Sequence, residues 1–278
     1  MRYGSMQFAI NCNRDLMKES AIEDTPLFNQ SLAKALSVIR AFSSRQRTMT
    51  LAEIAIVAQI TRSSAQRIVF TLEALGYIRK HPQTRRFLLT PRALSIGCNY
   101  LEADPLVDCA NPFLAALNAQ CKESVALTEP DGLDMVYVSR FPSHEHVTIH
   151  VPVGKRVPMY CTGSGRAYLS ARNDQESMEI LKQSERKKYT PTTITDIGEI
   201  LNMLEEAKAR GYAYNNEELY IGDVTIASPI VNASGEAIAA VHVAAPGSRW
   251  TFAEASQKLA PLVLECARSI SNAARNFD

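Results

Sequence analysis

Residues 50–76 read TLAEIAIVAQITRSSAQRIVFTLEALG, and this stretch decides the fold of the N-terminal part of the chain. Thr50 and Glu53 have the spacing of a capping box, in which the hydroxyl caps the start of a helix and the carboxylate reaches back to the same backbone. The helix that begins there is short, and Thr61 is placed to cap a longer helix over residues 62–75. A short helix, a tight connection and a longer helix predict a helix-turn-helix.

The helix predicted over residues 62–75 has two distinct faces. Its inward face consists of apolar residues at helical spacing, namely Ala65, Ile68, Val69, Leu72 and Leu75. Its N-terminal half turns polar side chains outward, which suits a recognition helix because Arg pairs with guanine, Gln with adenine, and Ser with phosphate or base. The candidate DNA contacts on this helix are Arg62, Ser63, Ser64, Gln66 and Arg67.

The neighbouring segments complete a winged helix-turn-helix. A first helix is predicted over residues 31–42 from the apolar stripe Leu32, Ala35, Leu36, Ile39 and Phe42. After the recognition helix, two short strands over residues 77–80 and 86–89 flank a turn. Arg85 and Arg86 make this hairpin a basic wing and join the candidate DNA contacts. The alternative, a small helical domain whose basic face is merely solvated, explains the order of these elements less well.

The charge distribution separates this region from the rest of the chain. Residues 30–95 contain eleven Lys or Arg and two Glu, a net charge of +9, whereas the whole chain carries +1. Residues 1–29 therefore carry −1 and residues 96–278 carry −7. A basic segment attached to a larger acidic one predicts a module that binds a polyanion, joined to a domain with another role.

Length and composition indicate an ordinary two-domain globular protein. The chain has 278 residues, of which 46% are apolar and 21% charged, and this usage excludes a disordered or fibrous protein. No apolar run approaches the roughly 18 residues of a membrane-spanning helix. The first thirty residues are too charged for a secretory signal, so we expect a cytoplasmic protein that does not bind a membrane. The six cysteines contain no C-x-x-C pair and are expected to be reduced thiols.

The second part of the chain mixes predicted strands and helices. Pro91 opens a helix that we interpret as an interdomain linker, and a further helix beginning at Pro105 or Pro112 ends near Cys121. Strands are predicted over residues 124–128, 135–139, 147–151, 224–231 and 236–244, and helices over residues 162–171, 174–182, 197–210 and 252–275. This pattern predicts an α+β domain with an antiparallel sheet covered by helices.

This second part offers no convincing catalytic or metal motif. Ser164 lacks the glycine two positions earlier that a nucleophile elbow requires, and no Lys-Ser/Thr pair follows to make a phosphate loop. His144, His146 and His150 have an even spacing that would place them on one strand face as possible metal ligands, but ordinary solvent-facing residues are the favoured interpretation. We therefore predict neither an enzyme nor a metal or cofactor site.

The sequence resembles the IclR family of bacterial transcription regulators from about Gln30 to its end. In the first domain the resemblance is carried by Ser31-Leu32 with the following helix, by TLAEIA at residues 50–55, and by TLEALGYI at residues 71–78. The family usually has glycine in the wing turn where this chain has Arg85, and the added charge is a candidate phosphate contact.

Three stretches of the second domain carry the same resemblance. They are PMYCTGSGRA at residues 158–167, GYAYNNEE at residues 211–218 with Gly222 and ASPI at 227–230 after it, and AAVHVAAP at residues 239–246, where Ala245 replaces the usual glycine. In the family these stretches line a GAF-like pocket for a small metabolite that often bears a carboxylate. The resemblance implies the effector-binding residues Thr162, Gly163, Ser164, Gly165, Asn215, Thr225, His242 and Ala244.

The chemistry of these residues suits an anion. Backbone N–H groups of Gly163, Ser164 and Gly165 open a predicted helix, and the helix dipole would assist them in holding a carboxylate. Asn215 replaces the usual Asp and His242 a small hydroxyl residue, so we expect an anion to draw His242 towards its charged form. The alternative for His242 is a buried core histidine with its hydrogen bonds satisfied. An aromatic wall could come from Tyr137, Tyr160 and Tyr214, although packing is the more usual role of such residues.

The resemblance implies a DNA-binding transcriptional regulator, expected to be a repressor, that binds a pseudopalindromic operator as a homodimer or homotetramer. Its expected parts are an N-terminal arm at residues 1–29, a winged helix-turn-helix at 30–90, a linker helix at 91–104, and a GAF-like effector-binding and oligomerisation domain at 105–278. The competing hypothesis is a ligand-binding or enzymatic α+β domain whose basic module contacts RNA or a membrane surface.

Overall fold

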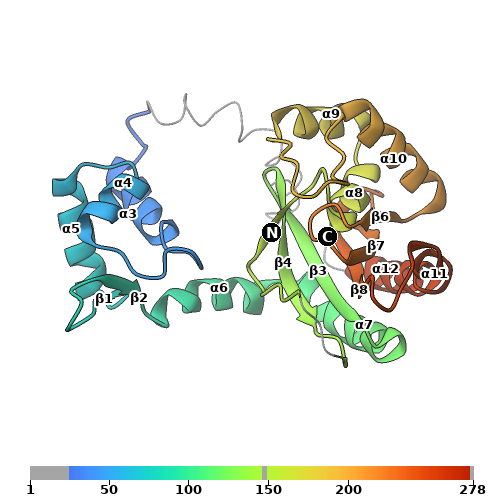
Figure 1. Ribbon diagram of the computed structural model, residues 1–278, viewed down its shortest axis with the longest axis horizontal. Coiled ribbons are helices and arrows are strands. Elements are labelled where there is room, and N and C mark those ends of the chain that lie inside the picture. The colour runs from blue at the N-terminus through green and yellow to red at the C-terminus, as the bar shows by residue number, and fades with distance from the viewer. Residues whose placement is uncertain (1–24, 146–148, 276–278) are drawn as a thin grey trace, which may run out of the picture. The chain divides into compact units, whose positions relative to one another are not determined.

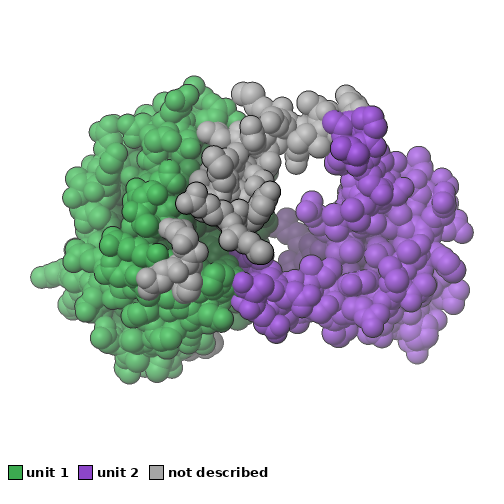
Figure 2. All heavy atoms as spheres, turned by 180° about the vertical axis from the view of Figure 1, so that it is seen from behind, with its two compact units in different colours: residues 1–13, 104–278 green, residues 14–103 purple. Residues whose placement is uncertain are grey.

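The computed structural model describes residues 25–145 and 149–275. It divides into two compact units, one whose described residues end at Ala103 and one that begins at Asp104, coloured separately in Figure 2. Residues 1–24 of the expected N-terminal arm lie outside the described residues. None of the described helices is both long and apolar enough to span a bilayer.

The first unit is a winged helix-turn-helix followed by one further helix, as Figure 1 shows. Its elements in chain order are α3 (Gln30–Arg40), α4 (Leu51–Val57), α5 (Arg62–Ala74), β1 (Ile78–Lys80), β2 (Phe87–Leu89) and α6 (Arg92–Ala103). The two strands pair antiparallel, and Met49 adds a bridge to Phe87. The small core that holds these elements together includes Val38, Ile54, Val69 and Ile78. The predicted N-terminal fold is confirmed.

Capping chemistry sets the start of both helices of the motif. The Thr50 hydroxyl accepts the N–H of Glu53, and the Glu53 carboxylate accepts the N–H of Thr50 at 2.7 Å, so the predicted capping box is present. Thr61 caps α5 by accepting the N–H of Ser64 at 3.2 Å. Between them Gln59 has a φ of 54°, a left-handed conformation that makes the connection tight.

Two predicted faces in the first unit are corrected by the structure. Helix α3 buries Val38, while Leu32 and Leu36 of the predicted stripe are 58% and 42% exposed. Leu75, predicted to point inward, caps the C-terminus of α5 and is 52% exposed. In both cases the residues do lie on a helix, but helical spacing alone does not determine which side of a short helix packs against its neighbours.

The second unit is built on a six-stranded antiparallel sheet with the order β5-β4-β3-β8-β7-β6. Its strands are β3 (Ser124–Asp131), β4 (Asp134–Phe141), β5 (Arg156–Pro158), β6 (Ala213–Asn216), β7 (Asp223–Val231) and β8 (Ala237–Pro246). The predicted strand over residues 147–151 is partly outside the described residues, and its described part, residues 149–151, is not a strand. The short edge strands β5 and β6 were not predicted, because three or four residues carry too little alternation to be recognised.

Helices cover both faces of this sheet (Figure 1). On one face α7 (Pro105–Cys121) and α12 (Ala260–Ala274) pack together and contact the central strands. On the other, α8 (Gly163–Ser170) contacts β6, β7 and β8 and is itself covered by α10 (Ile197–Arg210). The remaining helices are α9 (Asp174–Gln183) and α11 (Phe252–Lys258). The predicted α+β architecture is confirmed, except that the long helix expected over residues 252–275 is divided into α11 and α12, with proline in the first turn of α12.

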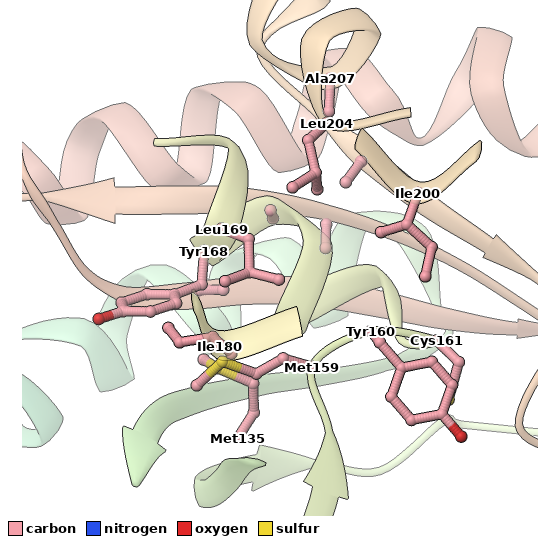
Figure 3. Close-up of a cluster of buried hydrophobic side chains, with 14 of the residues drawn as sticks. Met135, Met159, Tyr160, Cys161, Tyr168, Leu169, Ile180, Ile200, Leu204 and Ala207 are labelled. Atoms are coloured by element: carbon pink, nitrogen blue, oxygen red, sulfur yellow. The ribbon is translucent and has the colours of Figure 1, made fainter. Parts of the chain in front are cut away.

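The core under α8 fixes where that helix begins. Figure 3 shows Met135, Met159, Leu169 and Ile200 in this cluster, and all four are fully or almost fully buried. A Cβ added to Gly165 would lie 2.3 Å from the Cα of Met159, so only glycine lets the first turn of α8 approach the preceding chain this closely. The start of α8 is therefore held rigidly over the sheet.

Candidate DNA interface and ligand pocket

Helix α5 presents an exposed polar face in the first unit. The side chains of Arg62, Ser63, Gln66 and Arg67 are exposed, as the sequence predicts for a recognition helix. Ser64 is half-buried, and its hydroxyl accepts a hydrogen bond from the capping Thr61 at 3.0 Å, so its first role is in the cap. The Ser63 hydroxyl also lies 3.1 Å from the Thr61 hydroxyl, whereas Arg62, Gln66 and Arg67 remain predicted contacts to a major groove.

The two candidate arginines of the wing have different environments. Arg85 is exposed and has a φ of 58°, the conformation for which glycine is the natural choice. Arg86 is held within the unit, because its guanidinium donates to the Thr48 carbonyl at 2.9 Å and to the Glu53 carboxylate at 2.7 Å. Hydrogen bonds from Thr50 and Arg86 lower the pKa of Glu53. Arg86 therefore joins the wing to the capping box of α4, and Arg85 is the better placed of the two to meet a phosphate.

A pocket opens in the second unit between the start of α8 and the sheet. The space between its walls, counted together with the open solvent in front of it, is about 730 Å³. Seven of the eight residues expected to bind an effector line it: Thr162, Gly163, Ser164, Asn215, Thr225, His242 and Ala244. Gly165 does not, because it packs on Met159 and its N–H donates to the Thr162 hydroxyl at 3.2 Å.

The N-terminus of α8 supplies unpaired backbone donors to this pocket. Thr162 caps the helix, and the N–H groups of Gly163 and Ser164 belong to the first turn, which has no earlier helical carbonyl to accept them. Gly163 lies against β7, since a Cβ there would come within 3.0 Å of the Thr225 methyl. These two donors and the positive end of the helix dipole suit a carboxylate.

A buried ion pair behind the pocket holds β6 and α8 in place. Arg166 of α8 and Glu218 are 1% and 4% exposed at their side chains and form a bidentate pair. Glu218 donates its N–H to the Asn215 side chain at 2.8 Å, and its carboxylate accepts the N–H of Ile194 at 2.9 Å. Asn215 therefore has an internal partner for its amide oxygen. Sequence reasoning missed Arg166 and Glu218 because a buried pair 52 residues apart leaves no local pattern.

A bulge between β3 and β4 brings two further residues to the pocket. The register shifts between Leu127 and Thr128, which pair with Ser139 and Tyr137. In a regular strand residues 137 and 140 would point to opposite faces, but after the bulge both line the pocket. Arg140 also donates to the Ser124 hydroxyl at 3.3 Å. The bulge could not be predicted from sequence, and Arg140 was missed with it.

Two titratable groups in the pocket are shifted in opposite directions by burial. Burial, with the nearby Arg140, lowers the pKa of His242 to about 4, so its imidazole is neutral near pH 7. Burial raises the pKa of Asp223 to about 6, against the effect of a hydrogen bond from Thr225 at 3.1 Å. That a bound anion would draw His242 towards its charged form stays a prediction. The alternative, a core histidine with its hydrogen bonds satisfied, is not supported, because Nδ1 of His242 has no hydrogen-bond partner among the described residues.

The tyrosines proposed as an aromatic wall and the histidines considered as metal ligands have different surroundings in the structure. Tyr137 lines the pocket and packs edge-on against His242, with ring centroids 5.2 Å apart. Tyr160 instead donates to the Lys187 carbonyl, and Tyr214 packs on Phe252. His144 contacts Asn118 and His150 contacts Arg140, while His146 lies outside the described residues. Within residues 25–145 and 149–275 no three His, Cys, Asp or Glu side chains gather as a metal site would require.

Two family models match the chain along most of its length. Residues 31–82 match the IclR helix-turn-helix domain. Residues 98–272 match the model described as bacterial transcriptional regulator IclR C-terminal. The first range covers α3 from its second residue through β1, and the second covers the sheet, the pocket and all but the last two residues of α12.

Individual relatives extend over both units. The Pca regulon regulatory protein of Pseudomonas putida is 33% identical over 251 residues, 90% of this chain and 86% of that one. The HTH-type transcriptional repressor AllR of Escherichia coli K12 is 26% identical over 244 residues, 88% of this chain and 90% of its own. The crystal structure of an IclR homologue from Microbacterium hydrocarbonoxydans, complexed with 4-hydroxybenzoate, has a TM-score of 0.74 at 21% identity, covers 88% of this chain and 99% of that chain, and shares the fold.

Proposed function

Because this chain belongs to the IclR family of bacterial transcriptional regulators, we propose that it is a repressor whose binding to operator DNA is controlled by a small carboxylate in the pocket of the second unit. The family and the relatives are DNA-binding transcriptional regulators and not enzymes, and the same holds for this chain. The repressor role is supported by AllR, and the homo-oligomer with a pseudopalindromic operator remains a prediction from the usual symmetry of such regulators.

The observation that carries the proposed ligand is the start of α8. Two backbone N–H groups, at Gly163 and Ser164, lie at the edge of a pocket whose lining also includes Arg140, Asp223 and His242, two tyrosines, and apolar and small side chains. The carboxylate of a ligand would replace water on these donors and gain from the helix dipole. The fold neighbour that was crystallised with 4-hydroxybenzoate supports a ligand of this class.

A matched pair of substitutions at Gly163 tests this placement. Gly163→Pro and Gly163→Ala add a Cβ at the same position, 3.0 Å from the Thr225 methyl, but only proline removes the N–H. Proline is tolerated at the first position of a helix, so the fold should survive. A thermal-shift screen of small organic acids on the full chain finds the probe, and calorimetry then gives its affinity for each variant. We expect the proline variant to bind at least tenfold more weakly than the alanine variant. Equal affinities would place the carboxylate elsewhere.

We expect Asp223 to make the affinity of the pocket for a carboxylate depend on pH. It lines the pocket beside Thr225, so an ionised Asp223 would repel a carboxylate at the start of α8. The titratable and charged groups around it are Tyr137 and Arg140 on β4, Tyr220 before β7, and His242 on β8. With the pKa of Asp223 raised to about 6, affinity for the carboxylate should fall as pH rises through 6. Asp223→Asn should remove that fall, and a fall that persists in this variant would exclude Asp223 as its cause.

The exposed face of α5 is the proposed reader of the operator. A side chain that pairs with a base edge contributes about 1–3 kcal/mol of specific binding, so Gln66→Ala should weaken specific DNA binding by that amount and leave non-specific binding almost unchanged. Glu73→Ala, exposed at the far end of α5, is the matched control and should change neither. Gel-shift titrations with DNA selected by the protein from a random pool measure both. An unaffected Gln66→Ala variant would remove this residue from base recognition.

A further inference from the structure

His242 has a buried ring nitrogen that no other group of the described residues pairs with. The residue is 2% exposed, lines the pocket, and its Nδ1 has no hydrogen-bond partner. Leaving a buried polar atom without a hydrogen bond is unfavourable, so we expect Nδ1 of His242 to have a partner in the ligand-bound protein. Its cross-strand neighbours are Ala126 on β3 and Ala227 on β7, and neither has a polar side chain to offer.

The sheet register places His242 near the strand residue that contacts the start of α8. Thr225, which contacts Gly163, is paired with Ala244, and His242 lies two residues further along β8. One interstrand spacing and two residues of rise put the Cα atoms of Thr225 and His242 roughly 8 Å apart. A ligand that holds its carboxylate at the start of α8 and extends along β8 therefore brings its other end to the imidazole.

The neutral imidazole of His242 determines which chemical group suits the end of the ligand away from its carboxylate. In a neutral ring one nitrogen donates and the other accepts, and Nδ1 takes either role according to the tautomer. A hydroxyl can both donate and accept, so it satisfies Nδ1 in either case. A ligand ammonium group is unsuited because Arg140 already places a positive charge near the ring. Resting on the proposed function, we infer that the effector is a hydroxy acid whose hydroxyl group, on the side away from its carboxylate, pairs with Nδ1 of His242.

Matched ligands test the hydroxyl without any change to the protein. The probes are benzoate, 3-hydroxybenzoate and 4-hydroxybenzoate, with butanoate and 4-hydroxybutanoate as an aliphatic pair. In the full wild-type chain the best hydroxy acid should bind about fivefold to tenfold more tightly than its parent acid, the contribution of one neutral hydrogen bond. Terephthalate replaces the hydroxyl with a second carboxylate. Tighter binding of terephthalate than of 4-hydroxybenzoate would contradict the inference and make Arg140 the selecting group.

Variants of His242 assign the effect to this side chain. His242→Leu should reduce the advantage of the hydroxy acid over its parent acid to less than twofold. His242→Gln keeps a donor and an acceptor and should retain part of the advantage. Tyr214→Phe, whose ring packs on Phe252 and does not line the pocket, is the control and should retain all of it. If His242→Leu does not fold, the ¹⁵N signal of Nδ1 in the wild type decides, because it should shift with the hydroxy acid and not with its parent.

The outcomes separate this inference from the proposed function. Carboxylates that bind with no preference for the hydroxyl, or with a preference that His242→Leu retains, would overturn the inference and leave the proposed function standing. Failure of every carboxylate to bind would overturn both.

Discussion

At the scale of single residues, the pocket contains two groups whose effects on stability oppose each other. The folded pKa of His242, about 4, lies below its ordinary value of 6.5, so the unfolded chain binds more protons between these values and the contribution of His242 to stability is lost as pH falls. The folded pKa of Asp223, about 6, lies above its ordinary value of 3.8, so the contribution of Asp223 is lost as pH rises. In the wild type the two trends oppose each other between pH 4 and 6.

Single variants should separate these trends. Relative to wild type, Asp223→Asn should gain stability as pH rises from 4.5 to 6.5, and His242→Leu should lose it, each by on the order of 2 kcal/mol. Urea unfolding of the three proteins at both pH values gives the comparison. The same pH trend in both variants would mean that the two groups do not have the opposed environments described here.

Arg85 combines an unfavourable backbone conformation with a useful charge. Its φ of 58° costs a non-glycine residue about 1 kcal/mol, so Arg85→Gly should match or exceed wild-type thermal stability. If Arg85 meets a phosphate, the same substitution should reduce the slope of log affinity for DNA against log salt by about one unit, while Arg85→Lys should retain the slope. An unchanged slope in Arg85→Gly would remove the wing tip from the DNA interface.

At the scale of elements, the start of α8 depends on a close approach that only glycine permits. Gly165→Ala would place a Cβ 2.3 Å from the Met159 backbone and should cost about 1–3 kcal/mol of stability, since neither backbone can move without disturbing the core. Gly97→Ala in α6 is the opposite case, because nothing lies within 4 Å of the added Cβ, and it should be neutral or stabilising by about 0.5–1 kcal/mol. Thermal unfolding of both variants measures the contrast. A tolerated Gly165→Ala would show that α8 can shift, and that the rigid placement of its N-terminus is wrong.

The helices and strands also show which features of the structure could be predicted from the sequence and which could not. The capping box at Thr50 and the cap at Thr61 were predicted because their chemistry is local, within three residues. The pocket residues Arg140 and Asp223 were not, because a bulge and a six-stranded register decide which side chains meet. Seven of the eight expected effector contacts do line the pocket, and for these the family resemblance supplied what local pattern could not.

At the scale of the whole molecule, the proposed function requires that a ligand bound in the second unit change the affinity of the first for DNA. A ligand can do so only by as much as its affinity differs between the DNA-binding and non-binding states. Ligand binding and DNA binding must therefore be thermodynamically coupled, and showing that each occurs does not show the coupling.

The most direct test is a fluorescence-anisotropy titration of the full chain with its selected DNA, with and without the carboxylate that binds best. For a repressor released by its effector, saturating ligand should weaken DNA binding by about 5-fold or more, within the range usual for allosteric coupling. Gly163→Pro should bind DNA as wild type does without ligand and need more ligand for the same effect. A carboxylate that occupies the pocket by calorimetry and leaves the affinity for DNA unchanged would contradict the account.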